Sequence, residues 1–211
     1  MKARDVIELA EKWLKENYPI GSLIRTYNSI NPLPRGYRMK LGDNWCAAFV
    51  SSLFWTVSAG DEDAFPYECG CERMVELAME KKLWVEDESV MPRIGWIPMF
   101  DWQDNGKGDN RGWSDHTGII TQVNEKTFNT IEGNVSGRIA RRNIKFNDKK
   151  LRGFIAPKYS DTSVTKTVQD VALEVIRGLW GTGKTRKERL SAAGYDYKVI
   201  QTEVNRLMKE L

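Results

Sequence analysis

The sequence predicts an α+β domain followed by a small helical module. Apolar residues recur with helical spacing in the first third of the chain, whereas β-branched and aromatic runs broken by Gly, Asn and Asp fill residues 94–156. Helices that precede strands are typical of the α+β class rather than of alternating α/β folds. The last 45 or so residues carry three short helical patterns, and 211 residues fit one full domain plus a small module.

The composition excludes several classes of protein. Lys and Arg (32) nearly balance Asp and Glu (29), and 41% of the residues are hydrophobic, so the chain is not of the disordered type. No apolar run is long enough to span a membrane. The single histidine, His116, cannot build a zinc site that needs two or three imidazoles. Three cysteines are too few for a disulfide scaffold and indicate synthesis in a reducing compartment.

Three helices are predicted before the strands. The first covers residues 6–14, whose apolar side chains follow the i, i+3, i+4, i+7 spacing of one helix face. Residues 18–44 are rich in Pro and Gly and are predicted to form a loop. The second helix then begins near Cys46, with Asp43 or Asn44 as N-cap, and ends near Gly60. The third covers residues 71–82.

The remaining elements follow in order along the chain. Strands are predicted at 94–100, 117–123, 127–131, 139–146 and 153–156. The module holds helices at 171–179, 185–193 and 197–211, the last capped by Asp196. The polar, Ser/Thr-rich residues 159–166 are predicted to link a domain at 1–158 to a module at 167–211. Residues 166–211 hold nine Lys or Arg and six Asp or Glu, and therefore the whole net charge of +3.

Four residues suggest nucleophilic chemistry. Cys46 lies in the first turn of the second helix, where the helix dipole lowers the pKa of a thiol. His116 begins a strand that would face this helix, and Glu132 and Asn134 end the next strand, close enough to orient an imidazole. The alternatives are a buried packing cysteine, a surface histidine beside a turn, and a solvated turn.

These residues occur in motifs that resemble the CHAP family of cysteine amidohydrolases and peptidases. The matching runs are Trp45–Val50, Asp115–Ile120 and Ile131–Asn134. The resemblance implies a papain-like fold, with N-terminal helices packed on an antiparallel sheet, and cleavage of an amide bond in peptidoglycan. It makes Cys46 the nucleophile, His116 the general base and then acid, and Glu132 the residue that orients His116. Asn134 would support the imidazole or the oxyanion, and Trp45 would contact the substrate.

The C-terminal module is similar to the CW-seven (Cpl-seven) type of cell-wall-binding repeat. The similarity rests on Val175–Gly183, Arg186–Leu190 and Ala193–Tyr197. It implies recognition of the disaccharide-peptide unit of peptidoglycan without choline. Four side chains are candidates for this contact, with the arginines pairing with peptide carboxylates and the aromatic rings stacking on a sugar: Arg186, Arg189, Trp180 and Tyr195. The alternative is that both aromatic residues form the core of the small bundle.

No metal site is predicted, although a calcium loop and a zinc site are possible alternatives. The loop that contains Asp101, Asp104 and Asp109 resembles a calcium loop in composition but lacks its ligand spacing, so a solvated hairpin is favoured and calcium stays open. Cys69 and Cys71 would complete a three-cysteine, one-histidine zinc site with Cys46 and His116. Ligation by two cysteines one residue apart is strained, which disfavours zinc.

The expected partner is bacterial peptidoglycan, without nucleic acid or membrane insertion. A basic stretch alternates with apolar residues as solvent-facing strand positions do, and it comprises Arg138, Arg141, Arg142, Lys145, Lys149, Lys150 and Arg152. We expect a phage or prophage endolysin, or an autolysin, made in the bacterial cytoplasm without a signal peptide and acting on the wall after the membrane is breached. The alternatives are an inactive wall-binding protein and an NlpC/P60-type peptidase. The bond cleaved, target species and oligomeric state stay open.

Overall fold

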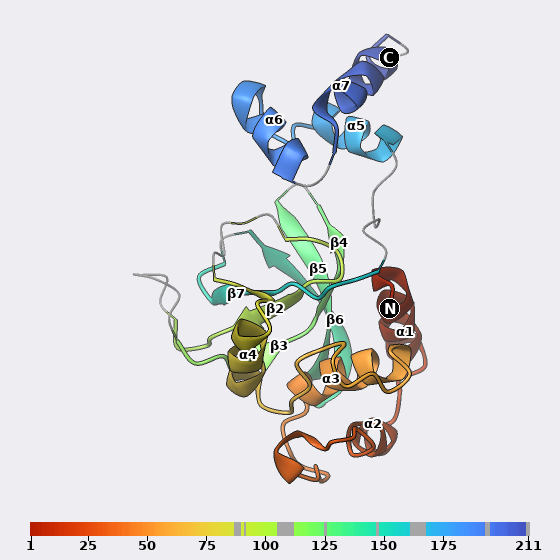
Figure 1. Ribbon diagram of the computed structural model, residues 1–211, viewed down its shortest axis with the longest axis vertical. Coiled ribbons are helices and arrows are strands. Elements are labelled where there is room, and N and C mark those ends of the chain that lie inside the picture. Colours follow the sequence, from red (N-terminus) through yellow and green to blue (C-terminus); the bar gives the residue numbers. More distant parts are fainter. Residues whose placement is uncertain are drawn as a thin grey trace. The chain divides into compact units, whose positions relative to one another are not determined.

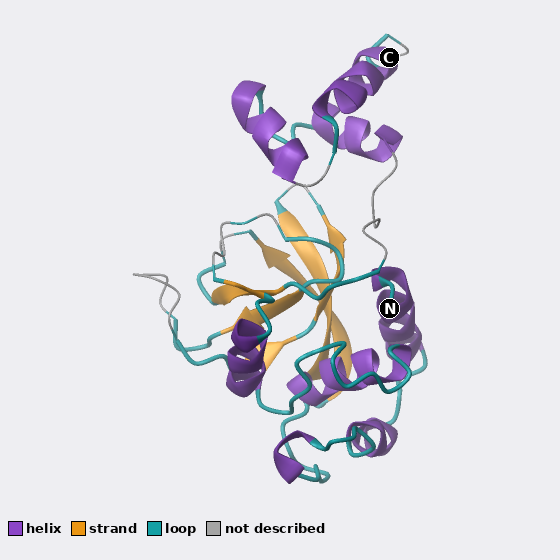
Figure 2. Ribbon diagram, viewed as in Figure 1, coloured by secondary structure: helices purple, strands orange, loops and turns teal. Residues whose placement is uncertain are grey.

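The chain folds into two compact units, Met1–Asp161 and Thr162–Leu211 (Figure 1). The computed structural model describes residues 1–86, 90, 92–104, 112–124, 126–146, 148–160, 168–192 and 195–209. The first unit combines helices with antiparallel sheets, and the second is helical (Figure 2). The predicted α+β class is therefore confirmed.

Four helices precede the main strands of the first unit: α1 (Ala3–Lys15), α2 (Ile20–Tyr27), α3 (Cys46–Val57) and α4 (Cys71–Glu80). A 3-10 turn, η1 (Pro34–Gly36), lies between α2 and α3. The prediction of a loop over residues 18–44 was wrong for α2. Pro19 occupies the N-cap of this helix, where its missing N–H costs no hydrogen bond, and Leu23, Ile24 and Tyr27 bury an apolar face.

The strands form two antiparallel sheets. One has the order β1-β7-β2-β3, from β1 (Trp84–Val85), β7 (Leu151–Ile155), β2 (Ile97–Phe100) and β3 (His116–Thr117). The other has the order β4-β5-β6, from β4 (Ile119–Val123), β5 (Thr127–Val135) and β6 (Arg138–Lys145). The strand predicted at 117–123 is therefore split at Gly118, where the chain passes from one sheet to the other.

The main core of the first unit lies between the helices and the strands. Helix α3 contacts β3 and β5, and its residues 46–54 are all buried. The side chains of α1 and α4 that complete this core include Val6, Trp13 and Met74. A second apolar cluster joins strands of both sheets and comprises Phe100, Ile120, Phe128, Ile144, Leu151 and Phe154. Packing on several sides fixes the start of α3 against the sheets.

The second unit contains α5 (Val168–Ile176), α6 (Gly183–Ala192) and α7 (Tyr197–Leu207). Asp196 caps α7 as predicted, because its side chain accepts hydrogen bonds from the backbone N–H groups of Lys198 and Val199 at 2.7 and 3.2 Å. This unit has its own core: Val171, Ala172, Val175, Trp180, Leu190, Ile200, Val204 and Leu207.

The start of the predicted linker belongs to the first unit. Tyr159 Oη donates to the carbonyl oxygen of Gly95 at 2.6 Å, and the N–H of Ser160 donates to the carbonyl oxygen of Met1 at 2.9 Å. Residues 159 and 160, at the start of the linker predicted at 159–166, are therefore hydrogen-bonded to the first unit. None of the helices in the described ranges combines the length and the apolar character needed to cross a lipid bilayer.

Candidate active site

Cys46 is the first residue of α3. The preceding residue, Trp45, provides no side-chain cap, and the backbone N–H of Ala47 in the first turn helps to lower the pKa of the Cys46 thiol. The Cys46 sulfur lies 3.5 Å from the Cys71 sulfur and 3.8 Å from the carbonyl oxygen of Asp115. The His116 side chain lies close enough to this sulfur for the two groups to shift each other's pKa. Cys46 is 5% exposed and His116 8% exposed, so both reach the surface with only a small part of their area.

His116 is held on its other side by Glu132. The His116 Nε2 and Glu132 Oε2 atoms are 2.7 Å apart, which leaves Nδ1 for the Cys46 sulfur. Glu132 is completely buried and accepts two further hydrogen bonds, from Thr130 Oγ1 at 2.6 Å and from Arg142 at 2.9 Å. A buried carboxylate with three donors is fixed in position and ionised, which is what a group that orients an imidazole requires.

The pairing of β4 with β5 brings Glu132 to His116. Ile119 lies opposite Ile131, so the residues that precede β4 meet the next residues of β5. A Cβ at Gly118 would lie 2.4 Å from Glu132 Cγ, and therefore only glycine leaves room for this carboxylate beneath the turn from β3 to β4. Glu132 is predicted near His116, and the structure brings the two side chains together.

The groups shift one another's pKa values. The pKa of Cys46 is well below its usual value because its sulfur is hydrogen-bonded to the Cys71 side chain; burial opposes this effect, and His116 adds to it. Burial would lower the pKa of His116, but its bonds to Cys46 and Glu132 and their charges raise it to about 9. Burial alone would raise the pKa of Glu132, but His116 and Arg142 hold this pKa below its usual value. The arrangement favours a thiolate and an imidazolium at neutral pH.

Trp102 and Arg142 complete the surroundings of the imidazole. The Trp102 ring stacks on the His116 ring at 5.5 Å between centroids and is 42% exposed. The Arg142 guanidinium lies 5.5 Å from the Trp102 ring centre, within range of a cation–π contact. An exposed aromatic ring thus borders the most buried part of the site.

The structure places the Asn134 side chain away from the imidazole and buries Trp45. Asn134 Nδ2 donates to Oδ1 of Asn44 at 3.2 Å, so its contact is with the segment before α3 and not with the imidazole. Trp45 is 3% exposed and belongs to the main core, where its ring lies against Gly133. It therefore presents no ring face to a substrate.

The predicted wall-binding side chains divide into core and surface. Trp180 is 7% exposed, donates from Nε1 to Glu174 at 3.1 Å and packs edge-on against Tyr195, which favours the core alternative for Trp180. Arg186 donates to the carbonyl oxygen of Gly181 and to Gln201. Arg189 lies on the surface. The structure thus leaves Arg189 as the most accessible of the four.

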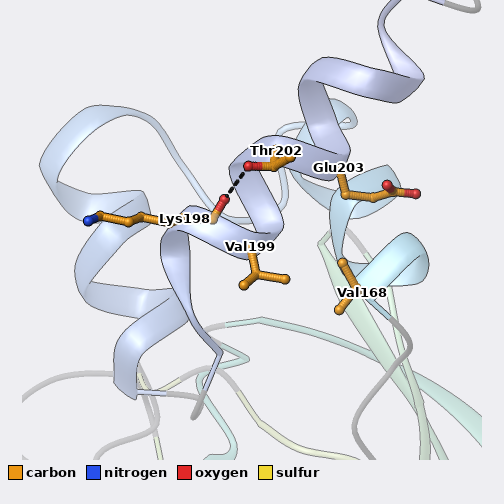
Figure 3. Close-up of a pocket in the computed structure, with 5 residues that line it drawn as sticks. All are labelled: Val168, Lys198, Val199, Thr202 and Glu203. Carbon is orange, nitrogen blue, oxygen red and sulfur yellow. Dashed lines mark hydrogen bonds between the residues drawn. The ribbon is translucent and has the colours of Figure 1, made fainter.

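A shallow hollow occurs elsewhere on the second unit. Figure 3 shows its lining, which consists of Val168, Lys198, Val199, Thr202 and Glu203. Thr202 Oγ1 donates to the carbonyl oxygen of Lys198 at 2.9 Å, so this hydroxyl is already used within α7. None of the four predicted wall-binding residues lines the hollow.

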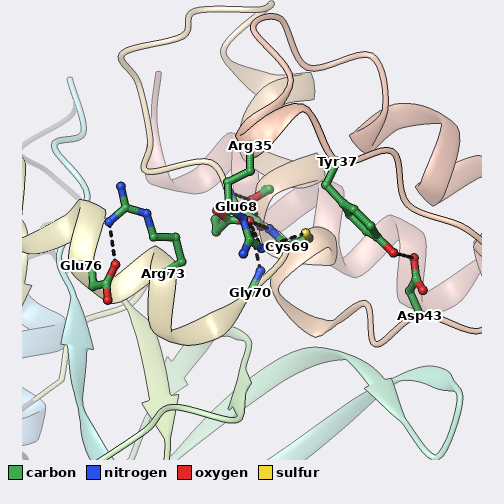
Figure 4. A network of polar contacts seen from close by, with 9 residues as sticks. Arg35, Tyr37, Asp43, Glu68, Cys69, Gly70, Arg73 and Glu76 are labelled. Carbon is green, nitrogen blue, oxygen red and sulfur yellow. Dashed lines mark hydrogen bonds and ion pairs between the residues drawn. The ribbon is translucent and has the colours of Figure 1, made fainter.

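The described residues contain no group of three or more His, Cys, Asp or Glu side chains arranged to hold a metal ion. Asp101 accepts from the N–H of Gln103 at 2.8 Å, and Asp109 lies outside the described residues. Cys69 contacts Arg35 at 3.6 Å, in a network where Arg35 also pairs with the buried Glu68 at 2.8 Å (Figure 4). The structure thus brings Cys46, Cys71 and His116 together and directs Cys69 elsewhere.

Sequence reasoning missed the roles of Arg142, Arg152 and Cys71. The prediction that both arginines face solvent is wrong for Arg152, which is 6% exposed, pairs with Glu72 and donates to Ser114 Oγ at 3.0 Å. Arg142 is partly exposed and pairs with Glu132. The β5–β6 pairing places Arg142 opposite Thr130, so a correct strand register was the signal for its contact with Glu132. The sequence connected Cys71 to Cys46 only through the disfavoured zinc site, because the contact joins the starts of two separate helices.

Comparisons with known proteins agree with the division into two units. The CHAP domain model matches residues 37–134, and the CW_7 repeat model matches residues 169–208. A protein named lysozyme from Streptococcus phage Cp-7 is 42% identical over 48 residues, which cover 23% of this chain and 14% of that lysozyme. No solved structure matches the chain significantly. The first unit therefore contains a CHAP domain, and the second contains a CW_7 repeat.

Proposed function

We propose that the protein is a peptidoglycan hydrolase of the endolysin type, which cleaves an amide bond in the stem peptide or between muramic acid and L-alanine. The observation that carries this proposal is the position of His116, between the Cys46 sulfur and the buried Glu132 carboxylate. This order of nucleophile, imidazole and orienting carboxylate is the arrangement of cysteine hydrolases. The CHAP domain and the phage lysozyme relative support the choice of peptidoglycan as the polymer.

Acylation begins with attack of the Cys46 thiolate on the carbonyl carbon of the amide. The attack forms a C–S bond and a tetrahedral intermediate with a negative oxygen. His116, protonated up to about pH 9, then donates its proton to the amide nitrogen, and the C–N bond breaks. The amine leaves, and Cys46 remains as a thioester.

Deacylation uses His116 in the opposite direction. The neutral imidazole takes a proton from water while the water oxygen attacks the thioester carbonyl. Collapse of the second tetrahedral intermediate breaks the C–S bond and releases the carboxylic acid, and the thiolate and imidazolium are restored. Glu132 keeps Nδ1 aimed at the reaction through its bond to Nε2 in both steps.

The negative oxygen of each intermediate requires donors near the start of α3. Amide groups in the first turn of a helix have no acceptor within the helix and favour a nearby negative charge. Of the two roles considered for Asn134, the contact with Asn44 favours the oxyanion role, since Asn44 lies two residues before the nucleophile.

The CW_7 repeat would keep the enzyme on its insoluble polymer. A binding module that is joined to a catalytic domain raises the local concentration of substrate without changing the chemistry. Arg189 is the accessible candidate for pairing with a peptide carboxylate of the wall.

The Cys46→Ala variant tests the nucleophile. We expect it to bind purified cell walls like the parent and to lose wall clearing, measured by turbidity, by at least about 1,000-fold, because Cys46 is the thiol that faces the His116 imidazole. Cys69→Ala is the matched control, since Cys69 contacts Arg35 and not the site, and it should clear walls at the parent rate. Equal clearing by Cys46→Ala and the parent would contradict the proposal, and a parent that binds walls but releases no fragments would identify an inactive binding protein. Mass spectrometry of the released fragments identifies the bond.

A further inference from the structure

The mechanism uses one of two sulfur atoms that lie in contact. Cys46 is the first residue of α3 and Cys71 is the first residue of α4, so the starts of two helices meet at a sulfur–sulfur distance of 3.5 Å. Cys71 is 7% exposed. Among the residues that the structure describes, the Cys46 sulfur is the hydrogen-bond partner shown for the Cys71 thiol. The buried S–H group of Cys71 is therefore expected to point toward the Cys46 sulfur.

We propose that Cys71 is a positioning residue for the nucleophile: its thiol donates a hydrogen bond to the Cys46 sulfur, stabilises the thiolate and holds it beside His116. Cys46 then has a donor on each side, the imidazolium and the Cys71 thiol. As a thiolate it no longer donates to the carbonyl oxygen of Asp115, 3.8 Å away, so the two donors determine its position. This inference rests on the proposed function, because a positioned thiolate matters only to a nucleophile.

The charges around the pair determine which sulfur ionises. Two sulfur atoms in contact cannot both carry a negative charge at moderate cost. His116 faces Cys46 and favours the charge there, with Glu132 behind the imidazole. The hydrogen bond with Cys46 and burial raise the pKa of the Cys71 thiol, and the nearby negative charges of Asp115 and Glu72 add to this effect. Glu72 is itself paired with Arg152. Cys71 therefore stays protonated and remains a donor while Cys46 is ionised.

The test measures the ionisation of Cys46 directly. The full-length protein is treated with iodoacetamide across a range of pH, and alkylation of Cys46 is followed by mass spectrometry of its peptide. We expect the midpoint for the parent well below pH 8.5. In Cys71→Ala the midpoint should rise by about one pH unit, since the donor is lost. In Cys71→Ser a hydroxyl replaces the donor, and the midpoint should stay within a few tenths of a unit of the parent.

A second pair of variants separates hydrogen bonding from packing. Cys71→Thr and Cys71→Val fill similar volumes, and only the first offers a donor, so Cys71→Val should show the higher midpoint. Cys69→Ala is the control and should keep the parental profile, because its sulfur lies against Arg35. Equal midpoints in Cys71→Ala and the parent, or in Cys71→Val and Cys71→Thr, would overturn the proposal. The readout needs no substrate, so a parent that fails to clear walls would refute the proposed function without changing this result.

Discussion

The Glu132 carboxylate connects three side chains of the candidate site. It is fully buried and accepts from His116, Thr130 and Arg142, so its charge is compensated from three directions. Removal of one partner from a buried charged network leaves the others without compensation, which makes such networks sensitive to single changes. The chemistry of His116 should therefore depend on the charge of Glu132 and not only on its shape.

Glu132→Gln keeps the shape of the side chain and removes this charge. We expect kcat/KM for wall hydrolysis to fall by about 100-fold, because the imidazole loses the partner that orients it and stabilises its protonated form. His116 must be protonated to release the amine, so activity persists below its pKa of about 9 and is lost as the pH rises through that value. Loss of the carboxylate lowers this pKa, and the alkaline limb of the pH profile should move down by about one unit or more.

Glu11→Gln provides the matched control for this change. Glu11 pairs with Arg141, and both side chains are about two-fifths exposed, so the same substitution there should leave the rate and the pH profile unchanged. An alkaline limb that stays near pH 9 in Glu132→Gln would show that Glu132 does not control the ionisation of His116.

At the residue scale, the sequence predicted that Cys46, His116 and Glu132 come together, and the structure places them together, while their catalytic roles stay predictions. Those three predictions depended on local signals: a helix start, a strand start and the end of the next strand. Arg142 and Cys71 could not be found in this way, because their contacts depend on strand register and on the meeting of two helices. Trp45 was misjudged, since an aromatic residue beside a nucleophile looks the same in sequence whether it is buried or exposed.

At the scale of elements, the close approach of α3 to β5 determines where Cys46 lies. Gly133 of β5 makes this approach possible, because a Cβ there would lie 2.5 Å from Phe49 Cβ and 2.8 Å from the Trp45 ring. Both contacts are with side chains at the start of α3. A larger residue at this position would push the nucleophile away from the strands.

Gly133→Ala should lower the free energy of unfolding of the first unit by about 1–3 kcal/mol, the usual cost of overpacking a core. Denaturant unfolding followed by tryptophan fluorescence reports on this unit, which holds seven of the eight tryptophans. Gly21→Ala, inside α2, is the control, because a Cβ at this position would lie 3.7 Å from its nearest neighbour, the Arg25 guanidinium. This change should be neutral or raise the free energy of unfolding by about 0.5–1 kcal/mol. Equal stability of Gly133→Ala and the parent would show that the helix start tolerates displacement.

The sequence predicted elements well where one face is apolar and poorly where the pattern is short. Helices α1, α3 and α4 follow from their periodicity. Residues 94–96, by contrast, read as part of a strand, but Gly95 has a φ of 85° and the strand begins only at Ile97. The division at Gly118 was equally hidden, since β3 has only two residues and its separation from β4 appears only in the pairing of the two sheets.

At the scale of the whole molecule, each unit has its own apolar core. A protein of residues 1–161 should therefore fold by itself and keep the alkylation profile of Cys46, while its affinity for purified walls falls by about tenfold or more, because the binding module is absent. Co-sedimentation with purified walls, followed by quantification of the bound protein, measures this loss. Unchanged binding would place the wall contacts on the first unit.

The candidate site also draws on both sheets of the first unit. His116 lies on the sheet that ends with β3, whereas Glu132 and Arg142 come from the sheet formed by β4, β5 and β6. The hydrogen bond between His116 and Glu132 thus joins the two sheets, and it forms only while the two sheets keep their relative position. A small shift between the two sheets would break this hydrogen bond even if each sheet kept all of its own hydrogen bonds, so the proposed activity depends on how the two sheets are packed together.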